Sequence, residues 1–184
     1  IGKNKLVFSS MRSDTIVFVD SKDTEAEPFT AKLYVAERED TNWIFKGEFE
    51  NVFNERGKYI GNGVFSRDKT KFFYSKCEES DDGRILCDIW YSEKDSGKWQ
   101  TPQPLSANVN TKKYTETQPA IGYYPKKKLE ILYFVSDREE GSRGGYDIWY
   151  TYFDKKKTKE WVTPVNCKTK INTAGNEMTP SYDL

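Results

Sequence analysis

Short apolar and aromatic runs alternate with turn residues along the chain, and this pattern predicts strands. Residues 132–135 form one such run, and residues 148–150 form the next. Between them, Gly141, Gly144 and Gly145 allow positive φ, so the chain can reverse. No long segment places apolar residues at i, i+3, i+4 and i+7. The pattern therefore predicts an all-β chain, with a long-looped β-hairpin as its unit.

The landmarks of this unit recur three times. Residues 32–35, 88–91 and 147–150 match one another, and a tryptophan follows each first residue by 11, 11 and 14 residues. An asparagine then follows each tryptophan by 11 residues. These landmark residues are Trp43, Trp99 and Trp161, then Asn54, Asn110 and Asn172. Four short strands in a repeat of about 60 residues are typical of a β-propeller blade.

The repeat divides the chain into blades. Residues 1–62 are expected to hold strands two to four of a first blade, with an insertion at 13–31. Residues 63–115 and 116–175 are the second and third blades, and 176–184 the inner strand of a following blade. Three blades are too few to close, because propellers commonly have about 4–8. We expect either half of a six-bladed propeller or two copies that complete one, so this segment alone would expose sheet edges and self-associate.

Two stretches resemble a known family. Residues 63–74 resemble the TolB-type, WD-like propeller box, with Gly63 and Arg67 in place of its two prolines and no glycine after Asp68. Residues 136–149 are similar to the S-D-R-x-G-G-x-G-G-x-D-I-Y version found in OmpA-family envelope proteins of Bacteroidota. In those proteins the propeller lies beside tetratricopeptide and peptidoglycan-binding domains. Some of them belong to the type IX secretion and gliding machinery.

The resemblance implies a function as well as a fold. It implies a periplasmic, outer-membrane-associated scaffold without enzymatic activity or cofactor. Its expected partners are other envelope or secretion-system proteins, together with the rest of the propeller or a second copy, and peptidoglycan only through a separate domain. Two alternatives are a carbohydrate-binding or glycoside-hydrolase-like propeller and a packing unit in a larger assembly.

Charge and hydropathy exclude other functions. The 29 basic and 29 acidic residues balance, whereas a nucleic-acid surface needs a basic excess or stripe. The lysine runs 126–128 and 155–157 are interpreted as solvated turns that discourage edge pairing. No apolar run approaches membrane-spanning length. Because the chain begins with Ile1, we interpret it as a piece of a longer protein.

Residues for catalysis are scarce. The chain has no histidine, which excludes a Ser-His-Asp or Cys-His pair within it, and its cysteines do not match a zinc spacing. The segment 92–99 only superficially resembles a sialidase Asp-box. Four acids recur at equivalent blade positions and are expected to perform structural work: Asp88, Glu116, Asp147 and Glu177. We therefore predict no catalytic, cofactor-binding or metal-binding residue.

Two cysteines bracket one hairpin loop. Cys77 ends a first strand and Cys87 begins its partner, so a disulfide between them is one expectation, in an oxidising periplasm. Reduced, partly buried thiols are the other. Cys167 has no assigned role.

Binding is expected where the repeat is broken, because loops on a rigid scaffold commonly carry function. The insertion at 13–31 is acidic and partly apolar, and its candidate partner-binding residues are Phe18, Asp20, Asp23, Glu25 and Glu27. The loop at 138–145 adds Arg138 and Arg143. The alternative is a loop braced by a contact between Asp137 and one of these arginines.

Overall fold

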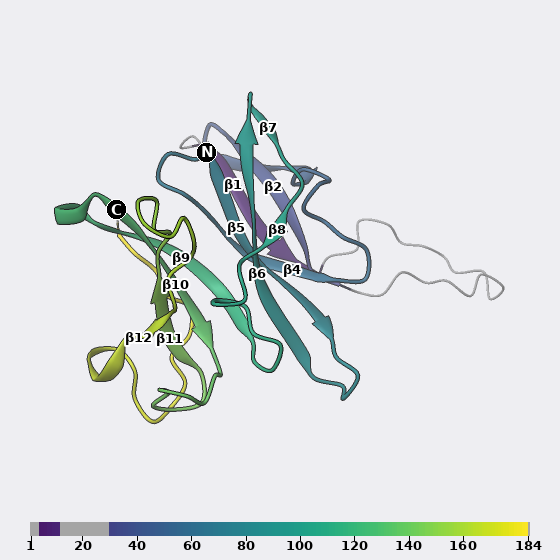
Figure 1. Ribbon diagram of the computed structural model, residues 1–184. Coiled ribbons are helices and arrows are strands. Elements are labelled where there is room, and N and C mark those ends of the chain that lie inside the picture. The colour runs from purple at the N-terminus through teal and green to yellow at the C-terminus, as the bar shows by residue number, and fades with distance from the viewer. Residues whose placement is uncertain (1–3, 12–29, 184) are drawn as a thin grey trace.

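The structure is a computed structural model that describes residues 4–11 and 30–183, and it is built from β-strands (Figure 1). Three antiparallel sheets follow one another along the chain. Within the described ranges there is no α-helix, only the 3₁₀ turns η1 (Pro125–Lys127) and η2 (Lys168–Lys170). The prediction of an all-β chain is confirmed.

Each sheet is formed from consecutive strands. The first sheet has the order β1 (Lys5–Ser10), β2 (Lys32–Glu39), β3 (Asn42–Glu48). The second has the order β4 (Tyr59–Phe65), β5 (Lys71–Glu79), β6 (Ile85–Asp95), β7 (Lys98–Trp99), and β8 (Gln103–Pro104) also pairs with β6. The third has the order β9 (Glu116–Tyr124), β10 (Leu129–Ser136), β11 (Asp147–Thr151), β12 (Val165–Asn166).

The three asparagines of the repeat perform the same task in each sheet. The Asn110 side chain accepts a hydrogen bond from the Ile89 amide at 3.0 Å and donates one to the Ile89 carbonyl at 3.0 Å. The same pair of bonds joins Asn54 to Leu33, and Asn172 to Ile148. Each asparagine thus binds a backbone amide of β2, β6 or β11 and adds a second hydrogen bond to a carbonyl that already accepts from a backbone amide. The spacing in the sequence reflects this clamp.

The core lies between successive sheets, in two clusters. In the first cluster, Leu33 and Val35 of β2 pack against Phe72 and Tyr74 of β5. In the second, Phe73 of β5 packs with residues of the third sheet, chiefly Leu132, Phe134 and Trp149. Alternate residues of β5 point to opposite faces, so its apolar run is buried on both sides. This explains why the strand is hydrophobic and aromatic without alternation.

The two ends of the sheets differ. One end, the turn end, carries the β4–β5 turn (66–70), the β9–β10 turn (125–128) and residues 152–161. The other end, the loop end, carries the β5–β6 loop (80–84) and the β10–β11 loop (137–146), both at the lower edge of Figure 1. The third sheet lies to one side of β5 and β6 in the same view.

Two boundaries differ from the sequence prediction. The second sheet begins at Tyr59, before the expected residue 63, and β4 contains a bulge between Gly61 and Val64. Residues 176–183 form no strand, although an inner strand is expected there. A strand requires a hydrogen-bonded partner strand, and the described residues offer none to this segment. It shares one backbone feature with β9, because Thr179 has φ 54° and Gln118, at the equivalent position where β9 is irregular, has φ 52°.

Candidate functional site

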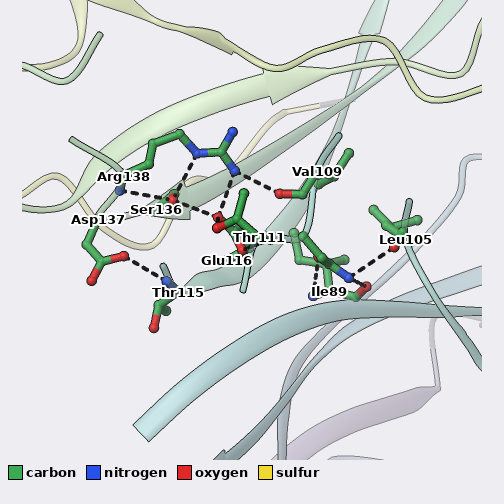
Figure 2. A network of polar contacts seen from close by, with 10 residues as sticks. Ile89, Leu105, Val109, Thr111, Thr115, Glu116, Ser136, Asp137 and Arg138 are labelled. Carbon is green, nitrogen blue, oxygen red and sulfur yellow. Dashed lines mark hydrogen bonds and ion pairs between the residues drawn. The ribbon is translucent and has the colours of Figure 1, made fainter. Parts of the chain in front are cut away.

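A buried polar network occupies the loop end and centres on Glu116, the first residue of β9 (Figure 2). The Glu116 carboxylate is 0% exposed. It accepts hydrogen bonds from the Arg138 guanidinium at 2.7 Å, the Thr111 amide at 2.9 Å, and the Thr111 and Ser136 hydroxyls, each at 3.1 Å. The network joins the start of β9, the end of β10 and the connection that precedes β9.

Arg138 is part of this network and not of the surface. Its side chain also donates to the Val109 carbonyl at 2.8 Å, and its guanidinium lies 5.0 Å from the Trp149 ring centre. Arg138 is only 9% exposed, so little of its side chain is available to the partner that the sequence analysis predicts for it. A buried guanidinium needs a paired carboxylate, and Glu116 supplies it. Asp137, which the sequence offers as the bracing acid, instead accepts from the Thr115 amide at 2.7 Å.

Burial dominates the titration of Glu116. It raises the pKa of the carboxyl to about 7, while the Thr111 amide and Arg138 act in the opposite direction. A raised carboxyl pKa is a common feature of active sites. Here, however, four donors from the chain already occupy the carboxylate. Glu116 is therefore a brace between strands, with its oxygens committed to the protein.

The other repeated acids also serve the backbone. Glu177 accepts from the Thr173 amide at 2.9 Å and from its hydroxyl at 2.5 Å, which repeats the Glu116–Thr111 arrangement. Asp147 accepts through Oδ2 from the Ser142 hydroxyl, the Arg143 amide and Asn166. These contacts agree with the structural role that the sequence predicts for the repeated acids.

The fourth repeated acid, Asp88, lies in β6. Burial, followed by the charge of Glu78, raises the pKa of its carboxyl, and Lys76 acts against both. One oxygen among the repeated acids, Oδ1 of Asp147, is buried without a hydrogen bond from the described part of the chain. In residues 4–11 and 30–183 there is also no cluster of three or more metal-ligating side chains.

The glycines of the β10–β11 loop serve two purposes. Gly141 has φ 80° and allows the turn that the sequence predicts. At Gly144, a Cβ atom would lie 2.0 Å from the Gly175 carbonyl oxygen, and the Gly145 amide donates to the same oxygen at 3.0 Å. This glycine pair thus allows the backbone of residues 173–176 to approach closely. That role differs from the positive φ that the sequence analysis assigns to these glycines. Arg143 of this loop is exposed, with its amide held by Asp147.

Cys77 and Cys87 lie directly opposite each other in the β5–β6 ladder. A disulfide joins them, with the sulfur atoms 2.04 Å apart. The bond closes the β5–β6 hairpin at the base of its loop, with a sequence separation of 10 residues.

Cys167 is half-buried and occupies the position that Leu105 holds in the second sheet. Its amide donates to the Ile148 carbonyl, as the Leu105 amide donates to Ile89 in the second sheet. Burial, with a smaller effect of Asp147, raises the pKa of the Cys167 thiol to about 11. The thiol is therefore protonated at neutral pH, which suits packing and not nucleophilic chemistry.

The repeated tryptophans pack between sheets, with one exception. Trp99 lies edge-on to Phe53 with ring centres 5.4 Å apart, and Trp161 lies edge-on to Phe73 at 5.8 Å. Trp43 is 48% exposed. It lies in the first sheet, which no sheet precedes in the described chain.

The acidic insertion at 13–31 is the first of the two predicted binding regions. Its candidate residues, Phe18, Asp20, Asp23, Glu25 and Glu27, lie outside the described residues. Of the predicted partner-binding residues, only Arg143 is thus described and exposed.

A cleft at the turn end was not predicted from the sequence. It has a volume of about 820 Å³ and lies between the second and third sheets. Both lysine runs border it, through Lys126, Lys127, Lys128, Lys155 and Lys156. Two separate lysine runs at equivalent ends of neighbouring hairpins were the available signal. The sequence does not show that the two runs converge, because this depends on how the sheets pack. Each run by itself is therefore interpreted as a solvated turn.

Across the described ranges, no helix has the length and apolar character needed to cross a membrane. Comparison of the chain with protein-family models, with curated proteins and with solved structures found no match. The assignment of a function therefore depends on the geometry of the chain itself.

Proposed function

We propose that this chain is a non-enzymatic protein–protein interaction scaffold, built from three blades of a TolB-like β-propeller. The observation that carries this proposal is the equivalence of the three sheets. Each has the same asparagine clamp, and successive sheets bury an aromatic cluster between them. Repeated sheets that stack with an apolar core between them are a feature of propeller blades, which supports the proposal.

The remaining blades are supplied by the rest of a longer chain or by a second copy. The exposed face of the third sheet supports this proposal. Tyr133 and Tyr150 lie on that face, at positions equivalent to Phe73 and Tyr91, which pack toward the third sheet. Tyr182 stacks on Tyr133 with ring centres 6.3 Å apart and covers part of the face. In the proposed propeller, another blade packs against these tyrosines.

The proposed setting is the periplasm, in association with the outer membrane. The Cys77–Cys87 disulfide supports it, because such bonds persist in oxidising compartments. The resemblance to OmpA-family envelope proteins favours other envelope or type IX secretion components as partners. Peptidoglycan would be bound only through a separate domain.

A glycoside-hydrolase-like function has less support. Its chemistry needs two carboxyl groups that are free to act on a glycosidic bond. Glu116, Glu177 and Asp147 instead accept hydrogen bonds from the protein's own backbone and side chains. This commitment favours the scaffold over the enzyme.

The test is crosslinking of the full-length parent protein in its native membrane fraction, followed by affinity purification and mass spectrometry. We expect reproducible crosslinks to other envelope proteins. Deletion of residues 13–31 should weaken partner recovery while the thermal unfolding midpoint stays unchanged. Recovery of glycan fragments without any protein partner would contradict the proposal, and unchanged recovery after the deletion would remove the insertion from the binding surface.

A further inference from the structure

The cleft between the second and third sheets has an aromatic floor. Phe73 lies at its base, stacked on Tyr91 with ring centres 5.8 Å apart. Trp161 lies edge-on to Phe73, and Phe153 continues outward from Trp161, edge-on at 5.8 Å. Phe153 is 36% exposed, so the floor extends from the core to solvent. Such a gradient fits one large apolar or aromatic side chain of a ligand.

The rim of the cleft is basic, although the whole chain is neutral. Seven basic side chains line it against four acidic ones. The basic residues are Arg67, Lys71, Lys126, Lys127, Lys128, Lys155 and Lys156. The acidic residues are Asp68, Glu93, Glu130 and Asp154. The excess gives the cleft a positive potential that attracts anions.

The four acids are each engaged within the chain. Glu93 pairs with Lys71, and Asp68 accepts from the Ser66 hydroxyl at 2.7 Å and the Thr70 amide at 3.0 Å. Glu130 accepts from the Arg67 amide at 2.6 Å. Asp154 accepts from the amides of its own turn. The acids therefore hold the turns in place and leave most of the lysine charge without a carboxylate partner.

Five lysines of the rim form no ion pair within residues 4–11 and 30–183. They are Lys126, Lys127, Lys128, Lys155 and Lys156, and all are exposed. Their backbone is nevertheless fixed, because the Lys128 amide donates to the Pro125 carbonyl and the Lys156 amide donates to Asp154. Two ordered turns thus present ammonium groups without an ion pair on either side of the aromatic floor, and that of Lys127 lies 5.8 Å from the Tyr124 ring centre. A ligand with several carboxylates around an apolar group would match this arrangement.

We propose that this lysine cleft binds an acidic peptide segment that carries an aromatic or large apolar anchor residue. The inference rests on the proposed scaffold function and names its docking site and the chemistry of its partner.

A saccharide fits less well, because no asparagine or glutamine lines the cleft and its acids are engaged. Such planar polar groups are what orient a polar ligand in a pocket. The one guanidinium, Arg67, stacks over Tyr123 at 3.8 Å. Lysines act as mobile point charges that suit spaced carboxylates.

The test uses the full-length protein and a short fluorescein-labelled peptide of aspartate and glutamate with one central phenylalanine. Fluorescence anisotropy should show saturable binding that weakens as salt increases. The triple variant K126E/K127E/K128E should weaken binding at least about tenfold, because it reverses charges on the rim. Replacing the peptide's phenylalanine by alanine should also weaken binding about tenfold, through loss of the anchor.

The double variant K168E/K170E is the matched control, since it reverses lysines of η2 outside the cleft and should leave binding unchanged. Equal binding by the triple variant would overturn the inference, as would equal binding of the alanine peptide. Polygalacturonate that displaces the peptide and binds more tightly would assign the cleft to an acidic glycan instead. If native partners crosslink to the full-length triple variant as they do to the wild type, the cleft is excluded and the scaffold function stands. If crosslinking of the wild-type protein finds no protein partner at all, both the lysine-cleft inference and the scaffold function are contradicted.

Discussion

Single polar residues decide how the loop end of this protein is held. Glu116 and Arg138 are distant in the sequence, yet each satisfies the charge of the other in the interior. Removing one partner from such a pair leaves an uncompensated buried charge, which costs more than the pair contributes. The geometry of the loop therefore depends on both side chains.

Substitution of Glu116 by alanine tests this brace. We expect Glu116→Ala to lower the free energy of unfolding by about 3–5 kcal/mol, because the Arg138 guanidinium loses its carboxylate. The matched control is Arg143→Ala in the same loop, whose side chain is exposed, and its effect should lie within about 0.5 kcal/mol. Urea denaturation measures both. Equal effects of the two substitutions would show that the network does not hold the loop.

At this scale the sequence predicted the types of role better than the partners. The repetition of Glu116, Glu177 and Asp147 indicated structural work, and their hydrogen bonds perform it. The choice between Asp137 and Glu116 as the partner of Arg138 was beyond the sequence. It depends on how β9 pairs with β10, which brings residues 116 and 136 together.

The β5–β6 hairpin follows the pairing register of the repeat and adds to it an extended tip with a disulfide. Its register matches that of the neighbouring sheets, with Ser75 opposite Ile89 as Val135 is opposite Ile148. β5 and β6 extend past the end of β4 as a two-stranded tip, and the disulfide joins them at the base of this tip, where Cys77 still pairs with Tyr59 of β4. Two strands alone are marginal, so a crosslink at the base of the tip stabilises the pairing beyond it.

Removal of this disulfide should therefore destabilise the hairpin. We expect the double variant C77S/C87S to lose about 2–3 kcal/mol of unfolding free energy, since the crosslink restricts the unfolded chain. Alkylation under denaturing conditions, read by intact mass, establishes the bond itself. One labelled thiol, from Cys167, is expected without reductant, and three are expected with it. Three labelled thiols in both samples would contradict the bond.

The presence of the main strands and the facing cysteines could be predicted from the sequence. The patterns that indicate them, apolar runs and turn residues, extend over only a few positions. The short strands β7, β8 and β12 and the absence of a strand at 176–183 could not be predicted in this way. β7 pairs with the adjacent end of β6 across a tight turn, whereas β8 and β12 pair with residues more than ten positions earlier in the chain. The tail has the bulge-like φ of an inner strand at Thr179, but strand assignment needs a partner as well as a conformation.

The whole molecule is a series of equivalent sheets with different surroundings. The middle sheet is covered on both faces, whereas the outer face of the third sheet carries exposed or half-buried tyrosines and the first sheet exposes Trp43. An exposed apolar face of this kind marks an interaction surface. The lysine cleft, also formed between sheets, is a second surface that only the packed molecule reveals.

The central claim is that these sheets belong to a longer repeating series, completed by further blades. Sedimentation velocity of the 184-residue chain over a range of concentrations tests it most directly. We predict species heavier than the 21.5 kDa monomer, because the terminal sheet faces associate, and we predict that Tyr150→Lys weakens this association. A single 21.5 kDa species at every concentration would contradict the claim.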